Sequence, residues 1–233
     1  MLVLAIDTAL QTGGAALVQD DRILGEVLLG PGATHSRRLL PVLDFLLKQT
    51  GYAKKNLEGI AVTLGPGYFT GLRIGVATAQ GLALALNLPC CGVSSLRLLA
   101  QGAAGFSGNL WVVADARRGL VYAACFKSEE NRLTRLMEDS ALTPARLAGM
   151  IQAPALLVGD GARLYADELT GPGRELAPAW ADTGRPALLA LMGARRLQRG
   201  EATPLERLTP RYCRPSEAEI RFGLPLDEYR LLE

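Results

Sequence analysis

The chain opens with short apolar segments separated by polar turns. Residues 2–6 form an apolar run that ends at Asp7, and residues 13–18 and 23–29 follow as two further runs. Apolar runs of this length, bounded by polar turns, are typical of strands. We therefore expect three consecutive strands at the start of the protein.

A helical pattern follows these strands. From residue 36 to about residue 50, leucines recur at helical spacing between Ser36, a candidate N-cap, and Gly51, a candidate stop. The next apolar segments predict alternating strands and helices: a strand at 59–64, a helix at 72–87, a strand at 89–93 and a helix at 95–103. The predicted order of the first half is β-β-β-α-β-α-β-α.

The second half repeats the opening pattern. VLAIDTALQTGGAALVQDDRILGEV and WVVADARRGLVYAACFKSEENRLTRL share an apolar strand, an Asp at its end (Asp7 or Asp115), a strand of small residues and a charged turn. Further elements are expected downstream: helices near 143–151, 162–169 and 186–199, and a strand at 156–158. We therefore predict two related lobes, 1–104 and 105–233.

Both lobes place an Asp after the first strand and before a hairpin. This is the layout of the actin-like ATPase and RNase H-like folds. The sequence therefore predicts an α/β protein with a two-lobed actin-like ATPase (ASKHA, RNase H-like) fold and a duplicated β-β-β-α core. In such folds these carboxylates face a cleft, so Asp7, Thr8 and Asp115 are candidates for nucleotide contact.

The composition is that of a globular protein, with 49% apolar and 21% charged residues. The N-terminal apolar run has no basic flank, so we expect no signal peptide and a cytoplasmic protein. Residues 74–96 carry no charge, but Gln80, Asn87, Pro89 and Gly92 interrupt them, so we expect no membrane-spanning helix.

The string GPGYFTG joins the predicted strand 59–64 to the predicted helix 72–87. Gly65 and Gly67 permit the close backbone approach that a phosphate cradle needs. No Lys follows them, so the string is not a Walker A loop. The loop is either a tight connection or an anion or partner contact. Arg73 is the candidate charge for that contact, and otherwise forms a salt bridge.

Few residues could support catalysis. The single histidine, His35, excludes an HExxH zinc site, and no GxSxG elbow presents a serine. Cys90 and Cys91 lie in apolar surroundings, which predicts raised thiol pKa values and no reactivity. Asp7 and Asp115 could hold Mg²⁺ and a nucleotide, but no phosphate loop follows Asp7. We expect no cofactor and no ATP turnover for this chain alone.

The two long helices carry more apolar surface than one sheet face can cover. The first has an apolar stripe and further apolar residues beside it: Leu39, Leu43, Leu46 and Leu47, then Leu40, Val42 and Phe45. The second has two rows of small residues: Gly71, Gly75, Ala79 and Ala83, then Ala77, Gly81 and Ala85. The side turned away from the sheet is covered either by a second protein or by the first helix of the same lobe.

The strings LAIDTA, THSRRLLPVLDFLL, AVTLGPGYFTGLRIGVATAQGLALA, GVSSL and VVADARRGLVYAA, in this order, resemble the TsaB (YeaZ) family. The resemblance implies a non-catalytic subunit that supports TsaD, the enzyme that makes N6-threonylcarbamoyladenosine at tRNA adenosine 37. TsaD binds its metal through an HxxxH motif after a GV pair. Ser95 and Leu99 stand at those two positions here, which implies that the metal site is lost.

The resemblance also implies how the chain assembles. TsaB pairs with TsaD through the two N-terminal helices, the ATPase TsaE assists, and these partners use ATP and Mg²⁺. Without TsaD a homodimer is expected, and tRNA is contacted only within the complex. The expected interface residues are Leu39, Val42, Leu43, Leu46, Arg73, Ile74, Ala77, Thr78, Gly81 and Ala85.

The alternative hypothesis is an enzyme, a small actin-like kinase or ATPase. It would use Asp7 and Asp115 around Mg²⁺-ATP, with Thr8, Gly65 and Gly67 in the same cleft. Micromolar binding of Mg²⁺-ATP by the isolated chain would favour this alternative.

Overall fold

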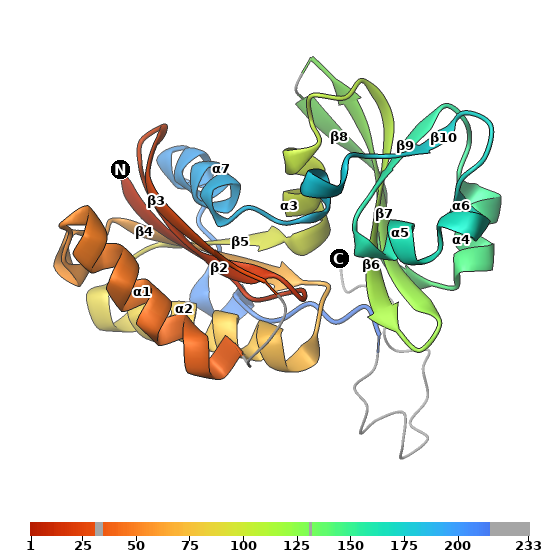
Figure 1. Ribbon diagram of the computed structural model, residues 1–233. Coiled ribbons are helices and arrows are strands. Elements are labelled where there is room, and N and C mark those ends of the chain that lie inside the picture. The colour runs from red at the N-terminus through yellow and green to blue at the C-terminus, as the bar shows by residue number, and fades with distance from the viewer. Residues whose placement is uncertain (31–34, 131, 215–233) are drawn as a thin grey trace. The chain divides into compact units, whose positions relative to one another are not determined.

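The computed structural model describes residues 1–30, 35–130 and 132–214 (Figure 1). The chain divides into two compact units, Met1–Leu98 with Gly184–Pro210 and Leu99–Thr183 with Arg211–Glu233. Each unit is built on a five-stranded mixed sheet that opens with three antiparallel strands. The predicted α/β class and the duplicated β-β-β opening are confirmed.

The first unit contains a sheet in the order β3-β2-β1-β4-β5. Its strands are β1 (Leu2–Asp7), β2 (Gly13–Gln19), β3 (Arg22–Leu29), β4 (Gly59–Gly65) and β5 (Cys90–Ser94). β1 lies between antiparallel β2 and parallel β4, and β5 is parallel to β4. Alternate residues of β1 join different core clusters, because successive side chains of a strand point to opposite faces. This sheet is therefore buried on both faces.

Helices cover both faces of the first sheet (Figure 1). α1 (His35–Thr50) and α2 (Phe69–Leu86) pack on one face, and α7 (Pro186–Gln198) packs on the other. Short 3₁₀ turns follow α1 and α7, η1 (Lys54–Asn56) and η3 (Leu205–Arg207). α1 begins at His35, so Ser36 lies inside the helix and is not its N-cap. Gly51 follows α1 with a φ of +76°, as expected for a helix stop.

The position of α7 explains why the units differ from the expected lobes 1–104 and 105–233. Leu189, Ala190 and Ala194 of α7 share a core cluster with Val3 and Ala5 of β1. The chain therefore returns to the first sheet after it has formed the second. Burial of the apolar face of α7 stabilises the first unit. Residues 184–210 therefore belong to this unit and not to the expected C-terminal lobe.

The second unit contains a sheet in the order β10-β9-β6-β7-β8. Its strands are β6 (Gly108–Arg117), β7 (Leu120–Glu129), β8 (Arg132–Leu142), β9 (Ala155–Val158) and β10 (Arg174–Leu176). Its helical segments are α4 (Pro144–Met150), α5 (Asp160–Leu164), α6 (Ala166–Leu169) and η2 (Ala179–Asp182), and α3 (Ser95–Gly102) contains the boundary between the units. The single helix predicted at 162–169 is two short helices, and the three-residue β10 was not predicted.

α2 is, within the described ranges, the one helix long and apolar enough to cross a membrane by length and composition. It also starts three residues before the predicted position, inside the GPGYFTG string. Six of its residues are buried: Gly71, Leu72, Gly75, Val76, Ala79 and Ala83. Packing in the core of the first unit therefore accounts for one side of this helix.

Candidate partner interface and strand-end carboxylates

The two rows of small residues on α2 meet different surroundings. Gly71, Gly75, Ala79 and Ala83 are buried, whereas Ala77, Gly81 and Ala85 are exposed. A Cβ atom on Gly75 would lie 2.2 Å from Thr8 Oγ1, but a Cβ atom on Gly81 would meet nothing within 4 Å. The first row therefore fits the helix onto β1, and the second leaves an open, smooth surface.

α1 shows the same division. Leu39, Leu43 and Leu46 are only 3%, 5% and 2% exposed and belong to the core of the first unit. These three expected interface residues hold α1 on the sheet and leave almost no surface to a partner. Leu40 and Phe45, on the other side of the helix, are 62% and 54% exposed. The predicted apolar stripe is present on α1, but three of its four expected interface residues lie on the buried side of the helix.

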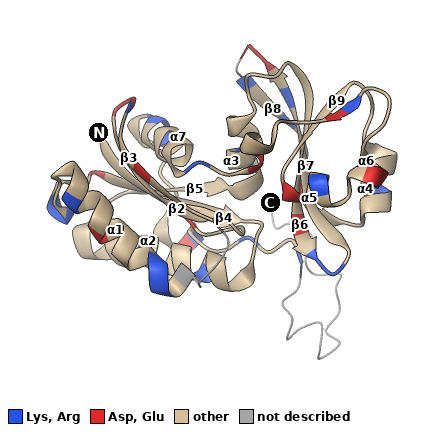
Figure 2. Cartoon of the chain, viewed as in Figure 1, with Lys and Arg blue, Asp and Glu red and all other residues tan. Residues whose placement is uncertain are grey.

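We define the α1–α2 surface as the exposed side of these two helices, which pack against each other on one face of the sheet (Figure 1). It comprises Leu40, Phe45, Ala77, Gly81, Leu84 and Ala85, with Val42, Ile74 and Thr78 half-buried beside them. Leu84 is 70% exposed and was not predicted, although it lies seven residues, or about two helical turns, after Ala77. Figure 2 shows α2 free of charged residues along most of its length.

Arg73 lies at the start of this surface. Its guanidinium carbon is 3.8 Å from the centroid of the Phe69 ring, one helical turn earlier, in a cation–π contact. This contact places the charge over a side chain of its own helix. The geometry therefore gives no support to a role for Arg73 as the anion contact of the GPGYFTG loop, residues 65–71, which we call the glycine loop.

Asp7 and Thr8, at the end of β1, are only 5% and 2% exposed. One carboxylate oxygen of Asp7 accepts hydrogen bonds from Thr63 Oγ1 at 2.7 Å and from the Ala9 amide at 3.2 Å. Thr8 Oγ1 donates to the Gly71 carbonyl of α2 at 2.7 Å. These two candidate nucleotide contacts thus join β1, β4 and α2 within the first unit.

The glycine loop packs against the same corner. A Cβ atom on Gly67 would lie 2.1 Å from the Ala9 carbonyl oxygen, which accepts a 2.7 Å hydrogen bond from the Tyr68 amide. Ser95 stands at one of the two positions where the TsaD histidines would be. Its Oγ donates a hydrogen bond to the Pro66 carbonyl and so holds this loop in place. Gly65 and Gly67 are buried. Of the two interpretations of the loop, the tight connection is the one that this geometry favours.

Asp115 occupies the corresponding strand end in the second unit. Its carboxylate accepts a 2.8 Å hydrogen bond from the Arg117 amide, and its own amide donates to Asp160 Oδ1 at 3.0 Å. Desolvation by burial raises the pKa of Asp160. A Cβ atom on Gly159 would lie 2.2 Å from the Val113 carbonyl oxygen. The turn 159–161 is therefore pressed against the end of β6, as the glycine loop is pressed against the residues after β1.

The cysteines of β5 are buried in the first unit. Burial raises the pKa of Cys90 to about 11 and also raises the pKa of Cys91. Both groups are therefore neutral thiols at physiological pH, and the prediction of raised thiol pKa values is confirmed. Across the described part of the chain, no three His, Cys, Asp or Glu side chains form a group that could hold a metal ion.

A cavity of about 210 Å³ adjoins the α1–α2 surface. Buried leucines line it, Leu4, Leu43, Leu47 and Leu57, together with half-buried Leu82 and exposed Leu40, Asp44 and Lys54. Asp44 pairs with Lys48 at 2.7 Å, and this contact lowers the pKa of Asp44. No local pattern in the sequence predicts this cavity, because its lining residues come from β1, α1, α2 and the segment around η1.

Known proteins resemble this chain in sequence and structure. The family model of TsaD, tRNA N6-adenosine threonylcarbamoyltransferase, matches residues 32–168. The tRNA threonylcarbamoyladenosine biosynthesis protein TsaB of Bacillus subtilis is 33% identical over 228 residues, covering 95% of this chain and 98% of that protein.

Two solved structures extend this comparison. An uncharacterized Pseudomonas aeruginosa protein with similarity to peptidase YeaZ superposes with a TM-score of 0.79 at 30% identity, covering 91% of this chain and 99% of that one. ROK hexokinase from Thermus thermophilus superposes with a TM-score of 0.52 at 13% identity, covering 85% and 100%. At that identity it shows the fold alone, which confirms the actin-like prediction. The extent of the match to TsaB establishes that the chain belongs to the TsaB (YeaZ) family, whose members are named for the biosynthesis of tRNA threonylcarbamoyladenosine.

Proposed function

We propose that this protein is a non-catalytic subunit in the synthesis of N6-threonylcarbamoyladenosine at tRNA adenosine 37, and that it binds the catalytic subunit TsaD. The observation that carries this proposal is the α1–α2 surface. Three large apolar side chains, Leu40, Phe45 and Leu84, are exposed there beside a row of small residues. Exposed apolar patches are typical of protein interfaces, and small residues let another helix approach closely.

The location of this surface supports the choice of partner. Both α1 and α2 lie within residues 32–168, the segment that the TsaD family model matches. A related chain would carry helices in the same arrangement. Related helical surfaces can pair about an approximate two-fold axis, as identical ones do in homodimers. The same argument favours a homodimer of the isolated chain through this surface.

The strand-end carboxylates support a non-catalytic role. Asp7 is buried and bonded to Thr63 and Ala9, while Asp115 is bonded to the Arg117 amide. The structural relative with similarity to a peptidase does not alter this assignment. Among the described residues, no three His, Cys, Asp or Glu side chains form a group that could hold the metal of a metallopeptidase. The sequence also has no GxSxG elbow to present a serine nucleophile.

The remaining components follow from the proposed role. We expect this chain to hold no cofactor of its own, and ATP and Mg²⁺ to act at TsaD and at the ATPase TsaE. We also expect tRNA to contact the chain only within the assembled complex, and the complex to lie in the cytoplasm.

The test is tRNA modification reconstituted from purified TsaD, TsaE, this chain, tRNA and the threonylcarbamoyl donor. Modified adenosine is expected when all components are present and is expected to fall to background when this chain is left out. Equal modification without it, or modification by this chain alone, would overturn the proposal.

The enzyme alternative has its own test. In a calorimetric titration of the isolated chain with Mg²⁺-ATP we expect no binding in the micromolar range. Micromolar binding that Asp7→Asn abolishes would instead favour a kinase or ATPase.

A further inference from the structure

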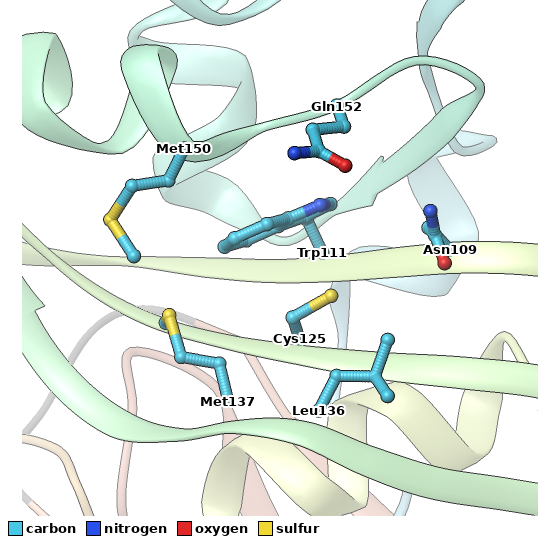
Figure 3. Close-up of a pocket in the computed structure, with 7 residues that line it drawn as sticks. All are labelled: Asn109, Trp111, Cys125, Leu136, Met137, Met150 and Gln152. Carbon is cyan, nitrogen blue, oxygen red and sulfur yellow. The ribbon is translucent and has the colours of Figure 1, made fainter.

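A pocket of about 290 Å³ lies in the second unit, on one face of its sheet (Figure 3). Its lining residues come from β6, β7, β8 and the end of α4: Asn109, Trp111, Cys125, Leu136, Met137, Met150 and Gln152. None of these side chains is charged at neutral pH, because burial raises the pKa of the one thiol, Cys125, to about 11. Apolar walls with a few polar groups are typical of small-molecule sites, and the volume is near the lower end of their range.

The fold gathers the polar residues at one end of this pocket. Asn109 and Trp111 are two residues apart on β6, so their side chains point to the same face of the sheet. Gln152 comes from the segment that follows α4. Figure 3 shows the Gln152 amide above the nitrogen end of the indole ring and Asn109 beyond that end, with Met137 and Met150 at the opposite end. The pocket therefore has a polar end and a thioether end.

The indole N–H of Trp111 is the observation that points to a ligand. Trp111 is only 6% exposed, yet its N–H has no hydrogen-bond partner within residues 1–30, 35–130 and 132–214. Buried tryptophans usually bond this group. The side-chain amides of Asn109 and Gln152 also make no hydrogen bond to a described residue. A ligand with several hydrogen-bonding groups would satisfy all three at once.

The chemistry of these side chains favours an adenine base. A carboxamide offers a donor and an acceptor side by side, which match the N7 acceptor and the N6 amino donor of adenine. Guanine presents two acceptors at the same edge, which Arg or Lys would match, and neither lines the described pocket. The other ring nitrogens of adenine can accept from the indole N–H. Methionine sulfur makes favourable contacts with aromatic rings, as the thioether end requires.

This pocket is separate from the strand-end carboxylates. Asn109 and Asp115 are six residues apart on β6, which corresponds to about 20 Å along the strand. The pocket also lacks a lining cation that could hold a phosphate group. It would therefore recognise the base itself, at a place that the carboxylates do not reach.

We propose that Asn109, Trp111 and Gln152 form a binding site for an adenine base, with Met137 and Met150 against the ring. The base belongs either to a free nucleoside or to an unpaired RNA nucleotide, because both present the same edge. This site is independent of the α1–α2 surface and of the proposed role in tRNA modification.

The experiment is a titration of the full chain with adenosine and with inosine, followed by Trp111 fluorescence and by equilibrium dialysis. The starting protein carries Trp180→Phe, so that Trp111 is the only tryptophan left of the two in the sequence. Inosine replaces the N6 amino donor with an acceptor oxygen. We expect adenosine to bind saturably and to change the Trp111 emission, and inosine to bind at least about tenfold more weakly, which is about 1.4 kcal/mol. No saturable binding of adenosine, or equal affinity for both nucleosides, would overturn the site.

A short adenine oligoribonucleotide distinguishes the two sources of the base. Binding at least as tight as that of adenosine would identify an RNA base, and binding of adenosine alone would identify a nucleoside. Either result agrees with an adenine site, whereas failure of both ligands contradicts it.

Matched variants test the polar end of the pocket. The double variant Asn109→Leu with Gln152→Met keeps similar side-chain volumes without the amides. We expect it to bind adenosine at least about tenfold more weakly and to lose the preference over inosine. Circular dichroism checks that its fold is retained. Gln198→Met removes an exposed amide of α7, in the first unit, and should change affinity less than twofold. Unchanged affinity in the double variant, or an equal loss in Gln198→Met, would contradict the proposal.

Discussion

The two sides of α2 carry similar residues and meet opposite surroundings. The buried row fits against Thr8 and the sheet so closely that Gly75 has no room for one more carbon atom. The exposed row has the same spacing and a similar composition, yet Gly81 faces open space. Small residues on a helix therefore do not by themselves indicate an interface. Only the structure separates the row that stabilises the unit from the row available to a partner.

The largest expected difference lies on α1, where the same contrast separates Leu43 from Leu40. Leu43→Ala should lower the free energy of unfolding by about 2–5 kcal/mol, because it opens a cavity in the core. Leu40→Ala should change it by less than about 0.5 kcal/mol, because Leu40 is 62% exposed. Urea unfolding of both variants measures these values, and equal losses would refute the division of α1 into a core side and an open side.

Gly75→Ala tests the buried row of α2. The new methyl group would clash with Thr8 Oγ1 and disturb its hydrogen bond to Gly71. We expect a loss of about 1–3 kcal/mol of unfolding free energy, as for other overpacked cores. Chemical denaturation measures it, and a gain in stability would show that α2 sits less tightly on the sheet.

The pH dependence of stability tests whether water is excluded from the side of α2 that packs on the sheet. Cys90 shares its core cluster with Ala79 and Ala83, and its pKa is about 11 against an ordinary value of 9.0. The unfolded state therefore loses this proton first, so the contribution to stability is full below pH 9 and falls as pH rises toward 11. We expect Cys90→Ala to remove about 1–2 kcal/mol of this alkaline loss.

Urea titrations at several pH values measure this loss for the wild type and for Cys90→Ala. If both proteins lose the same unfolding free energy at alkaline pH, the raised pKa of Cys90 is contradicted. Cys213→Ala, which alters a different, half-buried thiol with a raised pKa, is the control. It should remove its own share of the alkaline loss and leave the share of Cys90 in place.

Gly81→Ala tests the exposed row and should have the smallest effect. No atom lies within 4 Å of the new methyl group, and alanine has a higher helix propensity than glycine. The unfolding free energy should therefore rise by up to about 1 kcal/mol, the opposite sign to Gly75→Ala. Thermal unfolding of the two variants in parallel provides the comparison, and a loss in Gly81→Ala would mean that this row is covered within the chain.

Local patterns were sufficient to predict much of the fold. The apolar run 2–6 with Asp7 at its end, its repeat at Asp115 and the leucine spacing after residue 36 gave the strands, the duplication and α1. The attachment of α7 to the first sheet depends on contacts between residues far apart in the sequence. Its apolar pattern shows that it is buried but not against which sheet.

The candidate site was harder to predict for a related reason. A helix that is apolar on several sides does not reveal which side faces its own sheet, and the strongest stripe, Leu39, Leu43 and Leu46, was taken by the core. Leu84 could have been found from its helical position relative to Ala77.

The affinity of the chain for TsaD, measured by calorimetry for two matched variants, tests the central proposal most directly. Leu84 and Leu164 are exposed leucines on helices of different units, 70% and 60% exposed. Leu84→Glu is expected to weaken binding by at least about 30-fold, corresponding to about 2 kcal/mol, and Leu164→Glu by less than twofold. Both variants should unfold at the temperature of the wild type. Unchanged affinity in Leu84→Glu, with the fold intact, would contradict the assignment of the α1–α2 surface to TsaD.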